Sequence, residues 1–192
     1  MGTFETTTGA RTNSANLIIV REPKLPGACV SSWYVAYTRA NHEKRVAEQL
    51  EGRAVEYFLP SYKSVRRWKD RRVQLELPLF PGYVFARFPL RDRLRVLEVP
   101  GVVRLVGFNG QPAALPEKEI EALRESLARQ LKLKPHPYLT AGRRVRMKSG
   151  PLGGLEGILV RKKGSFQVIV SIELIMRSVI AEVELSDLEL VQ

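Results

Sequence analysis

A stretch of basic residues around a single tryptophan is the densest concentration of charge in the sequence. Six Lys and Arg side chains and one Asp lie between Lys63 and Arg72, so six minus one gives a local charge of +5. An aromatic ring among arginines can stack on a base while guanidinium groups neutralise phosphates, so this stretch is predicted to bind nucleic acid. A charged hairpin that only faces water is the alternative. The candidate nucleic-acid-binding residues are Arg66, Arg67, Trp68, Lys69, Arg71 and Arg72, with Arg39 and Arg53 extending the same surface.

A second candidate surface surrounds a Pro-Gly pair. The sequence at 79–85, Leu-Phe-Pro-Gly-Tyr-Val-Phe, has large aromatics on both sides of that pair. Pro81 fixes its own φ and Gly82 can take positive φ, so the pair predicts a tight bend before a strand that begins at Tyr83. Along that strand Tyr83 and Phe85 share one face, and the residues between them share the other. Both faces are apolar. We expect one to line the core of its own domain and the other to bind a partner, the alternative being a strand buried on both sides.

Residues that could carry out covalent or metal chemistry are scarce. Two histidines and one cysteine cannot build a Cys/His metal cluster. His42 is expected to be a solvated side chain rather than a catalytic base. The glycine-rich run at 150–157 lacks the Lys-Ser/Thr ending of a nucleotide-binding loop, and we find no paired-acid spacing. The sequence therefore predicts neither an enzyme nor a bound metal or cofactor.

The overall charge agrees with a polyanionic partner. The chain has 31 Lys and Arg against 20 Asp and Glu, a net charge of +11, which suits nucleic acid or an acidic protein surface. A single cysteine excludes an internal disulfide, and no secretory leader is recognisable. The longest early apolar run, at 17–20, is far shorter than the roughly 20 residues that cross a bilayer. We expect a cytoplasmic protein with no membrane role.

Two domains are predicted to position these surfaces. Residues 1–31 are rich in Thr, Ser, Gly, Ala and Pro and predict a flexible leader. A first strand is expected from Trp33, with Val35 and Tyr37 on the same face, followed by a helix with Asn41 as its N-cap. The further elements expected in a domain at 32–132 are a strand at 55–60, a polar hairpin at 62–77, a strand at 83–88, a polar connection at 91–95, a strand at 102–106 and a helix at 117–131.

The end of the chain is predicted to form a small β-barrel. Two prolines in three residues predict a short extended linker over 133–139. Five short strands are expected in a domain at 140–192, at 145–147, 157–160, 167–170, 179–183 and 188–191. Residues 172–183 also fit helical spacing, so a helix remains an alternative there. The predicted fold class is α+β.

Five motifs in this order resemble the NusG family of transcription elongation factors over roughly residues 33–192. The second group among them resembles a KOW motif in an SH3-like barrel. The arginine-rich hairpin and the Leu-Pro-Leu-Phe-Pro run resemble specialised paralogues such as RfaH more than the general factor. The motifs are Trp33-Tyr34-Val35, Glu43-Lys44-Arg45-Val46, Leu79-Phe80-Pro81-Gly82-Tyr83, Val99-Pro100-Gly101-Val102, and Gly150-Pro151-Leu152 with Gly157.

The resemblance implies a first, NGN-like domain with an antiparallel sheet flanked by helices, which docks on the clamp helices of the RNA polymerase β′ subunit. The implied docking residues are Val35, Tyr37, Phe80, Pro81, Tyr83 and Phe85. We expect this strip to be left uncovered by its own fold. The family's contact with the β gate loop falls at Arg93, Leu94 and Arg95, and the basic hairpin falls near the non-template DNA strand or nascent RNA.

The implied mechanism is mechanical. A factor attached to both sides of the polymerase cleft stabilises the closed clamp and so suppresses pausing or termination, without chemistry of its own. The KOW domain of a monomeric factor would recruit a small-subunit ribosomal protein or Rho. Its implied partner-binding residues are Ile172, Leu174, Ile175 and Met176, in a segment where this chain departs from the Phe-Gly-Arg turn of general NusG. The alternative function is that of a ribosome-associated or RNA-binding KOW protein acting through its basic hairpin.

Overall fold

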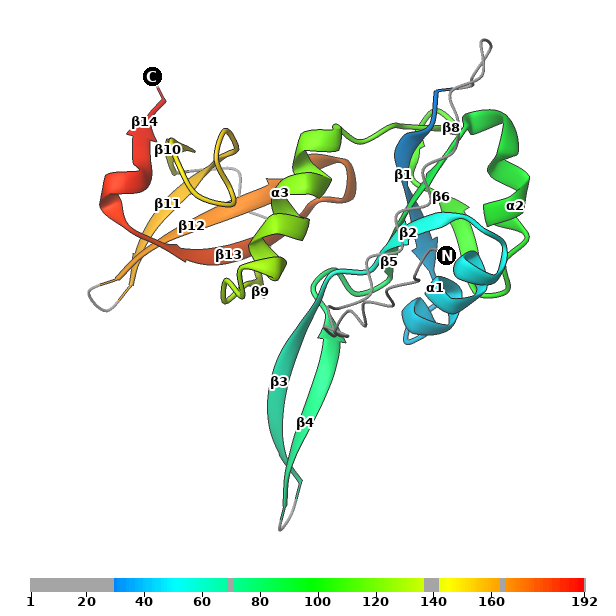
Figure 1. The fold of residues 1–192 in the computed structure, drawn as a ribbon, viewed down its shortest axis with the longest axis horizontal. Helices are drawn as coiled ribbons and strands as arrows, with labels where there is room; N and C mark the ends of the chain where they lie inside the picture. The colour runs from blue at the N-terminus through cyan, green and yellow to red at the C-terminus, as the bar shows by residue number, and fades with distance from the viewer. Residues whose placement is uncertain (1–29, 69–70, 137–141, 163–164, 192) are drawn as a thin grey trace, which may run out of the picture.

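Four antiparallel strands form the sheet of the first module (residues 30–128) (Figure 1). The computed structural model describes residues 30–68, 71–136, 142–162 and 165–191, so the expected leader lies almost wholly outside the described residues. Across the sheet the order is β2-β5-β1-β6. The strands are β1 (Ser32–Thr38), β2 (Glu56–Phe58), β5 (Tyr83–Phe88) and β6 (Val102–Leu105).

Two helices cover one face of this sheet: α1 (Glu43–Gly52) and α2 (Arg93–Leu97), which follows the 3-10 turn η1 (Leu90–Asp92). Val46 and Leu50 of α1 and Val96 of α2 are fully buried against the strand residues of that face. The expected polar connection at 91–95 is therefore wrong, because burial of Val96 anchors a short helix there. The expected N-cap is also wrong. Asn41 takes φ of 60°, and His42 holds the cap position without a side-chain hydrogen bond.

The alternation predicted along β5 is confirmed. Val84, Ala86 and Phe88 pack in the cluster beneath α1 and α2, whereas Phe85 belongs to a second cluster on the opposite face together with Val35. Both faces of the strand are therefore buried. Whether a partner can bind the second face therefore depends on which elements of the chain cover it.

A long hairpin extends from the first module as a ribbon of its own (Figure 1). Its strands, β3 (Ser61–Trp68) and β4 (Arg71–Pro78), pair with each other in a two-stranded sheet. A much smaller hairpin, β7 (Gly107–Phe108) and β8 (Gln111–Pro112), precedes α3 (Glu117–Ala128). The polar hairpin and the amphipathic helix were both predicted, and α3 begins directly after Pro116.

Six antiparallel strands form the second module (residues 134–191), a strongly curved, barrel-like sheet in the order β14-β10-β11-β12-β13-β9 (Figure 1). The five predicted strands are present, and the α+β fold class is confirmed. Gly157 is required by packing, since a Cβ there would lie 2.5 Å from Val168 Cγ1. The strands are β9 (Lys134–His136), β10 (Arg143–Met147), β11 (Glu156–Lys162), β12 (Ser165–Ile172), β13 (Arg177–Val183) and β14 (Leu188–Leu190), with 3-10 turns η2 (Glu173–Ile175) and η3 (Leu185–Asp187).

Two features of the second module differ from the expectation or resolve it. Lys134–His136 of the expected linker is extended, but it is bound into the sheet as β9 by pairing with Ser178, Val179 and Ile180 of β13. Residues 177–183, which also fit helical spacing, form β13, because β12 and β9 pair with it on both sides. Pairing with two strands therefore decides an assignment that local periodicity leaves open.

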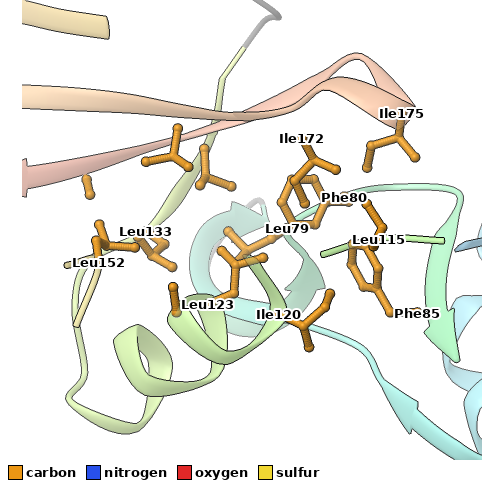
Figure 2. Close-up of a cluster of buried hydrophobic side chains, with 14 of the residues drawn as sticks. Leu79, Phe80, Phe85, Leu115, Ile120, Leu123, Leu133, Leu152, Ile172 and Ile175 are labelled. Atoms are coloured by element: carbon orange, nitrogen blue, oxygen red, sulfur yellow. The ribbon is translucent and has the colours of Figure 1, made fainter. Parts of the chain in front are cut away.

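One continuous hydrophobic cluster joins the two modules. It contains side chains from the first sheet, from α3 and from the second module, and Figure 2 shows Phe80 beside Ile172 and Ile175. Ile120 and Leu123 of α3 lie in the same cluster. The two modules are therefore packed together across the face of the sheet that α1 and α2 leave open.

Candidate binding surfaces

The aromatic strip (Val35, Tyr37, Phe80, Tyr83 and Phe85) occupies the sheet face opposite α1 and α2. Strand register brings it together, because Val35 pairs with Phe85 and Tyr37 with Tyr83 across β1 and β5. The rings of Tyr37 and Tyr83 lie 5.5 Å apart, and Phe80 meets Phe85 edge-on at 5.7 Å. The grouping inferred from strand parity and from the family resemblance is thus geometrically coherent.

The turn that begins β5 is held by a residue of α1. The buried Glu43 accepts a hydrogen bond from the backbone N–H of Gly82 at 2.7 Å. The carbonyl of Gly82, whose φ is +85°, accepts a hydrogen bond from the N–H of Thr38 at 2.8 Å. This role of Glu43 was not expected from sequence, where a first-turn acid indicates only a favourable position on the helix dipole.

The strip is mostly covered, contrary to expectation. Val35 and Phe85 are 0% exposed and Phe80 is 1% exposed. In Figure 2 the cover over Phe80 comes from Ile172 and Ile175 at the end of β12 and in η2, with Leu115 and α3 beside it. The reason is that the second module packs on this face.

One end of the strip stays open. Tyr37 is 37% exposed, Tyr83 is half-buried and Pro81 is exposed. The guanidinium of Arg104 lies over the Tyr37 ring at 5.5 Å. The covered part and the open part of the strip are continuous on the same two strands.

Polar contacts fix α3 to the sheet of the first module. Arg124 lies over the rings of Trp33 and Phe58, at 4.7 and 5.2 Å, and its guanidinium is 3.0 Å from the Glu56 carboxylate. Glu117 pairs with Arg87 at 3.1 Å. The apolar stripe of this helix could be predicted from the sequence, but these charged contacts could not. Nothing in the sequence of this amphipathic helix indicates that Arg124 contacts aromatic rings.

The residues implied to bind a partner of the KOW domain lie at the boundary between the modules. Ile172 and Ile175 are buried against the strip, and Leu174 is half-buried. Met176 is 64% exposed and takes left-handed φ of 50°. The structure therefore brings three of these four side chains to the same contact that covers Phe80.

The basic hairpin presents a row of exposed cations. Lys63, Arg67, Arg71 and Arg72 are exposed, and none has an ion pair among the described residues. Arg67 lies directly opposite Arg72 in the strand register, which is unfavourable in isolation. The side chains of Arg66 and Trp68, and all of Lys69, lie outside the described part of the structure. The hairpin thus has the charge density that an anionic partner would relieve.

The acid near the base of the hairpin is already engaged. Glu76 accepts a hydrogen bond from the Ser61 hydroxyl and is 3.7 Å from Lys44. The Ser61 hydrogen bond, with help from Lys44, lowers the pKa of Glu76 below its ordinary value. This carboxylate lies opposite Lys63 in the strand register, and the Lys63 charge also lowers its pKa, so Glu76 offsets part of the positive charge at the base of the hairpin.

Two arginines assigned to binding surfaces hold α1 and α2 together. The Arg53 guanidinium donates to the carbonyl of Arg95 at 2.9 Å and to that of Glu98 at 3.3 Å, and Arg95 donates to the Arg53 carbonyl. This pair ties the end of α1 to α2. Arg93 is exposed and Leu94 is 59% exposed, so these two remain available at the α2 surface. Arg39 is exposed after β1 but lies on a different element from the hairpin.

Neither a metal site nor a membrane span is recognisable in the described ranges. Within them, no three or more His, Cys, Asp or Glu side chains group as metal ligands. No helix there has the length and hydropathy needed to cross a bilayer. The features that the structure offers are surfaces for binding.

The sequence matches the family described as "Transcription termination factor nusG" over residues 31–124, from before β1 into α3. The transcription termination/antitermination protein NusG of Campylobacter jejuni is 30% identical over 139 residues, which are 66% of this chain and 78% of the relative. Its counterpart in Pasteurella multocida is 28% identical over 174 residues, 82% of this chain and 93% of the relative. The solved structure that describes domain interaction in Thermotoga maritima NusG has a TM-score of 0.54 at 22% identity, covering 85% of this chain and 98% of that one.

An antiparallel sheet with an aromatic strip, joined to a small β-barrel, defines a two-module binding protein. The sequence matches make the assignment specific. This chain belongs to the NusG family of transcription termination and antitermination proteins.

Proposed function

We propose that this chain is a transcription elongation factor that binds RNA polymerase at the β′ clamp helices through the aromatic strip. In this role it suppresses pausing or termination, and it recruits a second partner through its KOW-like second module. One observation carries the proposal. Ile172 and Ile175, which lie beside Phe80, come from the second module, so moving that module would expose more of the strip without unfolding a core.

Release of the second module would leave Phe80, Phe85 and Val35 as a contiguous apolar surface. A surface of that kind is stable in water only when a partner covers it. A pair of helices from a larger protein can take the place of Ile172 and Ile175, with Tyr37 and Tyr83 extending the contact. Arg93 and Leu94 of α2 then face the opposite side of the cleft, toward the β gate loop.

The mechanism requires no chemistry from the chain. A factor that touches both sides of the polymerase cleft binds the closed clamp better than the opened clamp. The paused state is disfavoured by that difference in affinity, and about 1.4 kcal/mol changes the ratio of the two states tenfold. Suppression of pausing or termination follows from this difference.

Both partner surfaces are buried by the same contact, which sets the order of events. Ile172 and Ile175 are inaccessible to a second partner while they cover Phe80. Polymerase binding would free them, so recruitment of a small-subunit ribosomal protein or Rho would follow polymerase binding. The basic hairpin is exposed while the two modules are packed together, a state called the closed form below. It would contact the non-template DNA strand or nascent RNA. We place the chain with RfaH-like paralogues on the strength of that hairpin.

Two variants with opposite effects test the proposal. Phe80→Ala combined with Tyr83→Ala should abolish binding of the full-length protein to a β′ clamp-helix fragment, measured by isothermal titration calorimetry. Ile175→Glu should tighten binding, because the measured Kd falls as the fraction of open protein rises. If the closed form is favoured tenfold, the gain is about tenfold.

Phe108→Ala is the matched control, since Phe108 is an exposed aromatic on the separate β7–β8 hairpin. It should leave the Kd unchanged. Equal binding by the wild type and the Phe80/Tyr83 double variant would contradict the proposed docking surface.

The closed form favours one alternative, an RNA-binding KOW protein that never uses the strip. Its supporting observation is that the hairpin cations are open while most of the strip is buried. Charge reversal at Arg67 and Arg72 that abolishes RNA binding, with RNA polymerase co-purification insensitive to the Phe80/Tyr83 variant, would establish this alternative.

A further inference from the structure

A half-buried acid lies at the contact between the modules. Glu119 is in the first turn of α3, next to Ile120, which is fully buried in the cluster that joins the modules. Its Oε2 atom is buried and has no hydrogen-bond partner among the described residues. A polar atom in that position costs free energy in the closed form and recovers its hydration when the modules separate.

A second acid, on the other module, lies close enough for its charge to act on Glu119. Glu173 begins η2, the turn whose Ile175 helps to cover Phe80, and it is exposed. Burial, and to a smaller degree the Glu173 charge, raise the pKa of Glu119 above its ordinary value of 4.5. The first turn of α3 itself favours negative charge, whereas burial and the Glu173 charge oppose it.

No cation compensates this pair. Neither Glu119 nor Glu173 takes part in an ion pair among the described residues. Glu117 is already paired with Arg87. The other charged or titratable groups on the surrounding elements are Lys118, Glu121, Arg124 and Glu125 on α3, Arg177 and Glu182 on β13, and Lys134 and His136 on β9.

We propose that Glu119 and Glu173 form a proton-dependent latch that sets how often the two modules separate. This inference rests on the proposed separation of the modules. The protonated Glu119 is compatible with the closed contact, whereas the ionised carboxylate is desolvated there and repelled by Glu173. Ionisation therefore favours exposure of the aromatic strip.

The direction with pH follows from the raised pKa in the closed form. Protonation of Glu119 contributes stability to the closed form that is fully present below 4.5 and is lost as pH rises through the raised value. Within that window the ratio of open to closed protein should rise by up to about tenfold per pH unit. Above it the ratio should stay constant.

Small-angle X-ray scattering of the full-length protein between pH 4 and pH 8 tests the latch, together with methyl NMR of Ile172 and Ile175, whose shifts report the nearby Phe80 ring. The wild type should open as pH rises. Glu119→Gln should remain closed and lose the pH dependence, with an open-to-closed ratio about three- to tenfold lower at neutral pH. Glu173→Gln should reduce the ratio to a smaller degree and provides a second variant.

Glu121→Gln is the matched control, because Glu121 is an exposed acid on the same helix without an ion pair. It should behave as the wild type. An unchanged pH response in Glu119→Gln, or equal closure of the wild type at every pH, would overturn the latch. Failure of the polymerase proposal would appear separately, as absence of clamp-helix binding by Ile175→Glu.

Discussion

The buried carboxylate of Glu43 accepts a hydrogen bond from the backbone N–H of Gly82 at 2.7 Å. Two sequence motifs 39 residues apart thus meet at one bond, with α1 supplying the acceptor and the Pro-Gly turn the donor. Gly82 also lies close to the aromatic strip, since a Cβ on this residue would be 3.4 Å from the Tyr37 ring. The geometry of the aromatic strip therefore depends on an acid on the opposite side of the sheet.

Glu43→Ala should destabilise the protein because it leaves the Gly82 N–H buried without a partner. We expect a loss of about 1–3 kcal/mol in the free energy of unfolding, measured by urea denaturation. Glu48→Ala, an exposed acid on the same helix, should change it by less than about 0.5 kcal/mol. Equal stability of the two variants would show that the hydrogen bond is not needed.

Gly157→Ala should destabilise the second module. The added Cβ would lie 2.5 Å from Val168 Cγ1 and 2.7 Å from the backbone oxygen of Ile169, so the strand itself must move. Overpacking of this kind costs about 1–3 kcal/mol, which a thermal melt followed by circular dichroism would detect. Gly52→Ala is the control, because nothing lies within 4 Å of a Cβ at that position.

Arg67→Ala combined with Arg72→Ala should weaken nucleic-acid binding and its salt dependence. Each phosphate contact contributes about 0.9 to the slope of log K against log salt on duplex DNA, so the slope should fall by roughly two. Fluorescence anisotropy of a labelled duplex at several salt concentrations gives both quantities. Lys118→Ala combined with Lys132→Ala removes the same charge from exposed positions outside the hairpin and should leave the slope nearly unchanged.

Arg124→Ala should loosen α3 from the first module. It removes the ring contacts with Trp33 and Phe58 and the ion pair with Glu56, for an expected loss of about 1 kcal/mol in the free energy of unfolding. In a Trp68→Phe background, emission from Trp33 should shift to longer wavelength as water reaches the ring. Arg129→Ala, which breaks only an exposed pair with Glu125, should produce no such shift.

Most of the strands and the two longer helices could be predicted, because side-chain periodicity and turn residues act over a few positions. Strand parity also agrees with the grouping of Val35 and Phe85 that the family resemblance implies, whereas their pairing is seen only in the structure. What could not be predicted was the covering of Phe80 by Ile172 and Ile175, which depends on how two modules pack. A strip that can bind a partner and a strip covered by its own chain have the same apolar pattern.

The charged contacts were equally hidden in sequence. Arg53 was assigned to nucleic acid because it is basic, yet it binds the carbonyls of Arg95 and Glu98. Arg124 and Glu119 stand within one amphipathic helix, and only the fold shows that the first touches aromatic rings and the second lies at the contact with the other module. The charge of a side chain predicts only the charge of its partner, whereas the fold determines which group it contacts.

Incorporation of Lys134–His136 into the barrel as β9 shortens the linker between the modules. Only residues 129–133 separate α3 from that strand, and five residues span at most about 17 Å when fully extended. A released barrel therefore stays within reach at an effective concentration in the millimolar range, so dilution of the protein cannot keep it apart. A bound partner must instead compete for the strip with a second module that stays tethered beside it.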